Sequence, residues 1–150
     1  MVYRPDVNAE RKPDIRRKRR LAFRVVAGSL LRPGALTATA FIGSMPDSRR
    51  TQFERSRGYP ILERGPLGNL RRAHKRSHYF PVIYVAASGL SVQAPIGYDV
   101  SSDNLRGSYL LKARNLGRPA ATPAMRLPVG GTGINVFQPV YRDGAPIRTA

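Results

Sequence analysis

Residues 78–99, HYFPVIYVAASGLSVQAPIGYD, constrain the fold more than any other part of the chain. The first part, residues 79–85, combines aromatic and β-branched side chains, which suit the half-buried surface of a sheet. Residues 87–89 are small and include a glycine, which predicts a turn, and residues 92–100 predict a returning strand. The segment therefore predicts two paired strands that bring Asp99 to a strand end beside the start of a helix.

Strong start and stop signals predict a helix directly after this segment. Residues 101–103, Ser-Ser-Asp, are suited to cap the first turn of a helix that covers residues 103–115. Gly117 suits the left-handed position after the last turn, and Pro119 prevents the helix from continuing. The predicted apolar face comprises Leu105, Tyr109, Lys112 and Leu116, with Leu111 and Ala113 near it.

Shorter elements precede and follow this central part. A brief helix is predicted to begin with Asp47 or Ser48 as its N-cap, to continue through Arg57, and to end at Gly58 and Pro60. Strands are predicted at residues 34–43, 61–63, 122–127 and 134–141; turns at residues 65–69, 129–133 and 142–144; and a basic connector at residues 70–77. This order predicts a mixed α/β (α+β) fold with an antiparallel sheet.

The charge of the chain is strongly positive. Twenty-six Lys and Arg residues against nine Asp and Glu give a net charge of +17, which favours polyanions as partners. Residues 1–31 predict a basic, poorly structured arm, and its cluster at residues 16–20 either is simply solvated or binds nucleic acid or acidic lipid. The absence of cysteine excludes disulfides and thiolate metal sites. No apolar run reaches the roughly eighteen residues that a membrane span needs.

The sequence predicts no enzyme, no metal site and no cofactor. His74 and His78 have the spacing of a helical zinc pair, but the basic residues between them and the lack of a nearby Cys or Glu favour two exposed histidines. Residues 130–133, Gly-Gly-Thr-Gly, lie between predicted strands and are not followed by lysine, so they predict a hairpin turn and not a phosphate-binding loop. The few acids after residue 50 form no obvious catalytic pair.

The alternative function that the charge favours is a small basic nucleic-acid-associated protein. Aromatic side chains interleaved with arginine can stack on the bases of a single strand. The candidates are Tyr59, Tyr79, Phe80 and Tyr84. Because these aromatics alternate with aliphatic residues, as core residues of strands do, the sequence disfavours nucleic acid and leaves net charge as the main support for this alternative.

Seven groups of residues together resemble the CHASE domain, an extracytoplasmic ligand-sensing module of bacterial sensor proteins and plant cytokinin receptors. In chain order they are Met45-Pro46-Asp47-Ser48-Arg49-Arg50 with Phe53 and Glu54; Gly58-Tyr59-Pro60 with Glu63-Arg64; His78-Tyr79-Phe80-Pro81-Val82; Gly97-Tyr98-Asp99; Lys112-Ala113-Arg114 with Gly117; Thr122 with Arg126-Leu127; and Pro139-Val140-Tyr141. The resemblance divides the chain into the arm, residues 1–31, and a CHASE-like domain, residues 32–150. It departs from the family at Leu116, where threonine is common.

The resemblance implies a PAS-like antiparallel sheet with flanking helices and a pocket for a small, purine-like ligand. The aspartate that matches Asp99 hydrogen-bonds the adenine ring in cytokinin-binding members, and a main-chain contact comes from the position of Ala121, next to Thr122. Tyr84 is expected as a further wall of the pocket. These four residues, Tyr84, Asp99, Ala121 and Thr122, are the predicted ligand-binding residues. The position of Asp99 between a strand end and a helix start allows a second interpretation, in which its side chain only accepts hydrogen bonds from the backbone at the helix start.

The function that the resemblance implies is small-molecule sensing, without catalysis, by a domain of a membrane signal-transduction receptor. Family members have a helical stalk and membrane spans on both sides, which place the domain on the extracytoplasmic face of the membrane. Residues 1–31 do not resemble that stalk, and the chain ends at Ala150 before the closing strand, the second span and any output domain. The expectation is therefore a receptor fragment with an incomplete stalk, truncated at its C-terminal end, with a homodimer left open.

Overall fold

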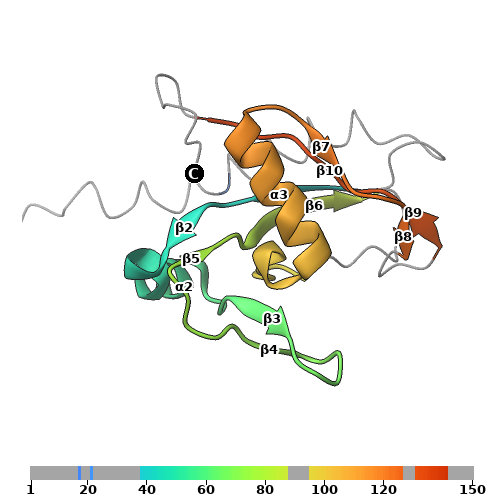
Figure 1. Ribbon diagram of the computed structural model, residues 1–150. Helices are drawn as coiled ribbons and strands as arrows, with labels where there is room; N and C mark the ends of the chain where they lie inside the picture. The colour runs from blue at the N-terminus through green and yellow to red at the C-terminus, as the bar shows by residue number, and fades with distance from the viewer. Residues whose placement is uncertain (1–16, 18–20, 22–37, 88–94, 127–130, 142–150) are drawn as a thin grey trace, which may run out of the picture.

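The protein has a mixed α/β fold, as the sequence predicts. The computed structural model describes Arg17, Leu21 and residues 38–87, 95–126 and 131–141. In chain order the elements are β1 (Ala38–Ile42), β2 (Met45–Pro46), the 3₁₀ helix η1 (Asp47–Arg49), α2 (Arg50–Arg57), β3 (Leu62–Arg64), β4 (Leu70–Arg72), β5 (His78–Tyr79), β6 (Val82–Ala87), the 3₁₀ helix η2 (Val100–Ser102), α3 (Asn104–Leu116), β7 (Ala120–Ala121), β8 (Met125–Arg126), β9 (Thr132–Gly133) and β10 (Val136–Phe137). Figure 1 shows their arrangement.

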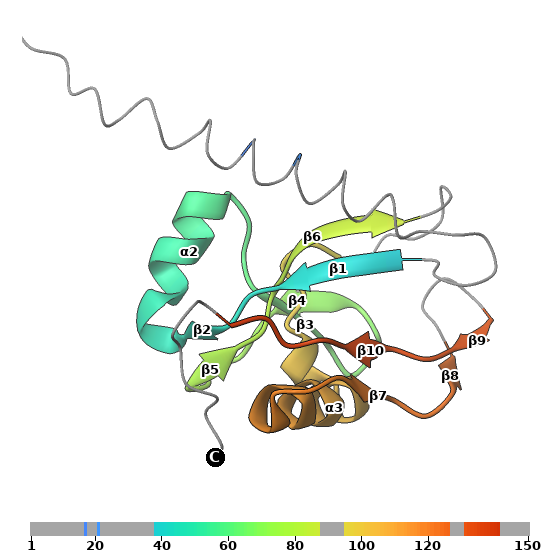
Figure 2. The ribbon, with the colours of Figure 1, turned by 90° about the horizontal axis from the view of Figure 1, so that it is seen from above.

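The strands that the structure describes form five two-stranded sheets: β1–β6, β10–β7, β2–β5, β3–β4 and β8–β9. Each of these pairs is antiparallel. The helix α3 packs against β7 and β10, whereas α2 lies at the β2 end of the domain (Figure 2). The antiparallel pairing agrees with the predicted class, and the PAS-like arrangement of one sheet stays a prediction.

The principal partner of β6 differs from the prediction. The ladder of β6 is formed with β1, the strand expected within residues 34–43, and not with a strand at residues 92–100. Residues 88–94, which include part of the predicted turn and return, lie outside the described residues. The end of the expected returning strand does pair, because Val82 N donates to Tyr98 O at 2.9 Å and Gly97 N donates to Val82 O at 2.8 Å.

A β-bulge changes which side chains of β6 share a face. Phe41 pairs with Tyr84 and Ile42 with Val82, so Ile83 lies between them without a partner in the ladder. Ile83 packs against the core cluster around Phe53, whereas Val82 belongs to the cluster around Phe80. The bulge therefore lets one strand contribute to both parts of the core.

In the described part of the chain, buried hydrophobic residues form two clusters. One comprises Met45, Phe53, Ile61, Ala73 and Tyr79, and the other comprises Phe80, Val82, Val100 and Leu110. Tyr79 and Phe80 are adjacent in sequence and point into different clusters, as successive residues of an extended chain do. Residues 78–82 therefore lie between the two halves of the core, which agrees with the central place that the sequence gives them.

The helix α2 forms where the sequence predicts it, but its N-cap differs. Gly58 ends the helix in the left-handed region with φ 77°, as expected. At the other end, neither η1 nor α2 has a side-chain cap, although Asp47 or Ser48 was expected to supply one. The carboxylate of Asp47 instead accepts a hydrogen bond from the hydroxyl of Tyr79 at 3.0 Å. A tertiary contact has replaced the local one.

The N-cap and the C-terminal glycine of α3 are confirmed, whereas the buried face of the helix differs from the predicted apolar face. Asp103 caps the helix by accepting from Arg106 N at 2.8 Å, and Gly117 ends it with φ 65°. The buried residues of the helix are Gly107, Leu110 and Ala113, whereas Leu105 and Leu116 of the predicted face are 39% and 48% exposed. The reason is close approach: a Cβ on Gly107 would lie 3.0 Å from the carbonyl oxygen of Ser101, so small residues let α3 pack tightly.

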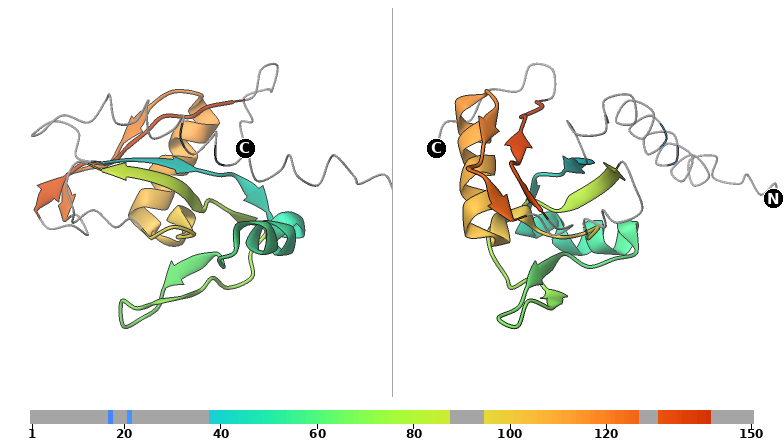
Figure 3. Two further views of the ribbon diagram at one scale, coloured as in Figure 1. Left: turned by 180° about the vertical axis from the view of Figure 1, so that it is seen from behind. Right: turned by 90° about the vertical axis from the view of Figure 1, so that its right-hand side faces the viewer.

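The connector predicted at residues 70–77 contains a strand. Leu70–Arg72 forms β4, which pairs with β3 across the turn at residues 65–69. This turn is confirmed, with Gly65 N donating to Asn69 O at 2.7 Å and Gly68 in the left-handed region at φ 79°. The hairpin β3–β4 projects from the body of the domain (Figures 1 and 3). The sequence pattern does not predict β4, because all three of its residues are exposed and the alternation of apolar and polar residues typical of a strand is lacking.

The strands predicted at residues 122–127 and 134–141 are present only in part, as β8 and β10. β7 lies before the first of them and pairs with β10, and β9 lies within the predicted turn at residues 129–133 and pairs with β8. The antiparallel β8–β9 pair agrees with a hairpin here, but the predicted turn is too long by Thr132 and Gly133. The predicted turn at residues 142–144 lies outside the described residues.

Gly97 is the position where glycine is most clearly required. Its φ is +87°, and a Cβ there would lie 2.6 Å from Pro60 O and 3.0 Å from Tyr59 Cδ2. Gly97→Ala should lower the free energy of unfolding by about 2 kcal/mol, because backbone strain and overpacking add together. Gly68→Ala is the matched control, since Gly68 has φ +79° and nothing within 4 Å of the added Cβ; it should cost about 1 kcal/mol. Urea denaturation of both variants checks this, and equal costs would contradict the packing argument.

Candidate functional site

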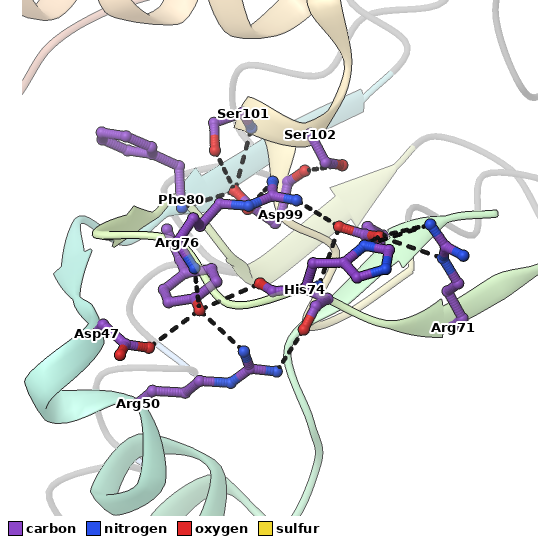
Figure 4. Close-up of polar contacts among 12 residues, drawn as sticks. Asp47, Arg50, Arg71, His74, Arg76, Phe80, Asp99, Ser101 and Ser102 are labelled. Carbon is purple, nitrogen blue, oxygen red and sulfur yellow. Dashed lines mark hydrogen bonds and ion pairs between the residues drawn. The ribbon is translucent and has the colours of Figure 1, made fainter.

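The carboxylate of Asp99 is the centre of the candidate site. Asp99 is fully buried, at 0% exposure. Its Oδ1 accepts from Phe80 N at 2.8 Å, Ser101 N at 3.1 Å and Ser101 Oγ at 2.7 Å, and its Oδ2 accepts from Arg76 Nη1 at 3.0 Å (Figure 4). Asp99 also caps η2 through the bond from Ser101 N. The local backbone role that the sequence allowed for Asp99 is therefore confirmed.

Arg76 joins Asp99 to a second buried carboxylate. While its Nη1 donates to Asp99, its Nη2 donates to Oε2 of Glu63 in β3. The Arg76 side chain is 30% exposed, so part of it is accessible to solvent. The planar fork of arginine suits this bridging role, since its donors can reach two carboxylates at once. One partly exposed cation thus forms ion pairs with two buried acids.

Glu63 is held by several basic groups at once. Besides its ion pair with Arg76, the carboxylate forms an ion pair with Arg71 Nη2 at 3.0 Å. It also accepts a hydrogen bond from His74 N at 3.2 Å and contacts His74 Nδ1. Burial acts to raise the pKa of Glu63, but the hydrogen bonds from His74 and the charges of Arg76 and His74 outweigh it and hold the pKa below its ordinary value. Glu63 is therefore an ionised, internally paired carboxylate.

The contact between Glu63 and His74 corrects one step of the metal argument. The sequence places no Glu beside His74, because the two residues are far apart along the chain, yet the hairpin brings them together. His74 is exposed as expected, whereas His78 is only half-buried and contacts Ser44 Oγ at 2.8 Å. No group of three or more His, Cys, Asp or Glu suited to hold a metal occurs among the described residues.

Tyr79 connects this network to α2. Its buried hydroxyl accepts from Arg76 N at 3.0 Å and from Arg50 Nη1 at 2.9 Å, and the Arg50 guanidinium lies 4.9 Å from the Tyr79 ring centre. Arg50 also donates to Glu54 at 3.0 Å. Burial acts to raise the pKa of Glu54, but hydrogen bonds from Ile61 N, Arg50 and Arg72 outweigh burial, so the pKa lies below its ordinary value. A continuous polar network therefore extends from Asp99 to α2.

The other predicted ligand-binding residues lie in different surroundings. The Tyr84 hydroxyl accepts from Arg57 Nη1 at 3.3 Å, and the Arg57 guanidinium lies 5.6 Å from the Tyr84 ring centre. Thr122 is buried between strands, where its N donates to Asn135 O and its Oγ1 accepts from Asn135 N, both at 2.9 Å. Ala121 is exposed in β7. The ligand contacts of these residues stay predictions.

Sequence reasoning missed Glu63, Arg76, Arg50 and Tyr79 as members of the site. A signal was present in the scarcity of acids, since each of the five acidic residues that the structure describes, Asp47, Glu54, Glu63, Asp99 and Asp103, forms an ion pair. In a chain with 26 basic residues, an acid inside a predicted strand such as Glu63 is a candidate for a buried pair.

His78 predicts a pH dependence of stability. Burial, followed by the charge of Arg114, lowers the pKa of His78 below 6.5, although Asp99 opposes this. As the pH falls below 6.5, the unfolded chain takes up the proton first, so stability decreases until the lower folded pKa is reached. Urea midpoints should therefore fall between pH 7.5 and pH 5, and His78→Gln should remove part of this fall. An unchanged slope in His78→Gln would contradict the assignment.

The acids of the network are paired with cations, and their hydrogen bonds connect β3, η2 and α2. Among the described residues, no helix has the length and apolarity needed to cross a membrane.

Comparison with known proteins identifies the family. The family model of the CHASE domain matches residues 17–150, which is most of the chain. A search of curated proteins finds no match. The chain therefore belongs to the CHASE domain family, the sensory domains of signalling receptors.

Proposed function

We propose that this CHASE domain binds a small molecule with N–H donors, such as a purine-like compound, through Asp99, as the sensory part of a membrane receptor. The observation that carries the proposal is the family match over residues 17–150. CHASE domains sense ligands without catalysis and are generally extracellular, so an extracytoplasmic location belongs to the same proposal. Asp99 supports it as a buried carboxylate, which is a strong acceptor for ring and exocyclic N–H groups.

Exchange at Arg76 is the step that we propose for ligand binding. The ligand would take the place of Arg76 Nη1 on Oδ2 of Asp99, the oxygen that accepts from one donor among the described residues. The exchange leaves Arg76 with a partner, because its Nη2 stays bonded to Glu63. Three donors on Oδ1 keep the Asp99 carboxylate in position meanwhile. The exchange therefore replaces the ion pair between Arg76 and Asp99 by a hydrogen bond from the ligand, while the other bonds to Asp99 stay in place.

The same exchange supplies a route for the signal. Arg76 contacts Glu63 through its side chain and the Tyr79 hydroxyl through its backbone N–H, and Tyr79 contacts Arg50 of α2. A ligand that moves Arg76 would bias the hairpin β3–β4 and α2 together. In a receptor, this is a population shift between two arrangements of the domain.

A thermal-shift screen of purines, amino acids and small metabolites tests the proposal on the full chain. A ligand should raise the melting temperature, and Arg76→Gln should tighten its binding several-fold, because the competing donor is gone. Arg118→Gln, at an exposed arginine, is the matched control and should leave the affinity unchanged. The role of Asp99 is wrong if a ligand stabilises the wild type and Asp99→Ala equally, and the exchange is wrong if Arg76→Gln binds as the wild type does.

A further inference from the structure

The tip of the hairpin β3–β4 exposes leucine to an unusual degree. Leu67 is 94% exposed at the turn, and Leu70 in β4 is 43% exposed. The hairpin projects from the body of the domain in Figures 1 and 3, so the tip reaches beyond its surroundings. An almost fully exposed leucine contributes little to the fold, and at a protruding point its apolar surface is accessible to a partner.

Arginines stand beside Leu70 on one face of the hairpin. In the β3–β4 register, Arg64 lies opposite Leu70, and Leu62 lies opposite Arg72, so these four side chains share a face. Arg64 is exposed and donates to the carbonyl of Gly68, an uncharged acceptor that leaves its positive charge in place. Arg72 is also exposed, although it pairs with Glu54. We call Arg64, Leu67, Leu70 and Arg72 the hairpin tip.

We propose that the hairpin tip binds the surface of an anionic lipid bilayer. Apolar side chains enter the boundary between headgroups and acyl chains, while arginines stay at the level of the lipid phosphates. Each basic residue near an anionic leaflet adds roughly 1 kcal/mol, equivalent to about a fivefold gain in binding. Nucleic acid accounts for the arginines but not for an apolar tip, since polyanion binding depends on the phosphate backbone. This inference does not depend on ligand binding at Asp99.

A single tryptophan can report insertion of the tip. The chain contains no Trp, so Leu67→Trp introduces one fluorophore in the full chain. Its emission should shift to shorter wavelength with vesicles that contain phosphatidylglycerol, and should not shift with vesicles of phosphatidylcholine alone. Val140→Trp is the matched control, because Val140 is another exposed apolar residue, and its emission should stay unchanged. Equal shifts at both positions, or none at position 67 while the protein co-sediments with vesicles, would overturn the proposal.

Matched substitutions separate the tip from the charge of the whole chain, which itself attracts anionic vesicles. Leu67→Ser should weaken binding to phosphatidylglycerol vesicles about fivefold, through loss of apolar contact, whereas Val140→Ser should not. Arg64→Gln should weaken it more than Arg118→Gln, which removes the same charge elsewhere. If a single-stranded oligonucleotide binds with the same dependence on Arg64 and vesicle binding ignores Leu67, the surface is a nucleic-acid site and the lipid proposal is wrong. Ligand-induced thermal shifts should be the same in all four variants.

Discussion

Glu63→Gln should lower the free energy of unfolding by about 3 kcal/mol, because it removes the negative charge at the centre of a buried ion network. The carboxylate is 3% exposed and pairs with Arg71, His74 and Arg76. Glutamine keeps the shape but offers one acceptor oxygen and places N–H donors against donors. Urea denaturation at pH 7, followed by circular dichroism, measures the change.

Arg72→Gln is the control for this prediction. Arg72 also makes an ion pair, with Glu54, but its side chain is largely exposed. Its loss should cost less than 1 kcal/mol, as exposed ion pairs usually do. If Glu63→Gln costs as little as Arg72→Gln, water already screens the network and the stability of the hairpin has another source. Because the pKa of Glu63 is lowered, its contribution should be present above pH 4.5 and be lost as the pH falls through the folded pKa.

The local features of the fold could be predicted because their causes are local. Gly58 and Gly117 end their helices with positive φ, and Asp103 caps α3, as the order of residue types indicates. Each depends on the conformational freedom of glycine or on a short side chain that reaches its own backbone. Such causes act within one turn of chain, so a single sequence contains all the information needed.

The pairing of β6 and the buried face of α3 could not be predicted because their causes are distant. β6 pairs with β1, whose residues lie 40 to 49 positions before their partners, and no property of either strand alone selects that partner. The predicted face of α3 centres on larger side chains with Ala113 near it, but Gly107 is also buried because the Ser101 backbone approaches it closely. Packing that depends on small size leaves no hydrophobic signal for a periodicity argument.

In the candidate site, too, the contacts with local causes could be predicted and those between distant residues could not. The position of Asp99 beside a helix start, and its bond to Ser101 N, follow from neighbouring residues. The ion pairs of Arg76 span 13 residues to Glu63 and 23 to Asp99, and they exist only because the hairpin and the segment after β6 come together. In a chain with so many arginines, the sequence does not show which one meets a given acid.

Asp99→Ala should lower the free energy of unfolding by about 4 kcal/mol, more than any other substitution named for this chain. It leaves the buried N–H of Phe80 and the N–H of Ser101 without their acceptor and deprives Arg76 of one partner. Each unsatisfied buried donor costs about 1–3 kcal/mol. Ser101→Ala removes the shortest bond to Asp99 but no charge, and it should cost about 1 kcal/mol. Urea denaturation of both variants checks these values.

A double-mutant cycle then decides how much of the role of Asp99 is structural. Arg76→Gln should cost less in the Asp99→Ala background than in the wild type, with a coupling energy of about 1–3 kcal/mol, because the two side chains share a hydrogen bond. A coupling near zero would mean that the Asp99–Arg76 contact adds nothing to the fold. In that case Arg76 could leave Asp99 without cost, which is the condition most favourable for a ligand. A large coupling instead sets the free energy that a ligand must match before it can replace Arg76.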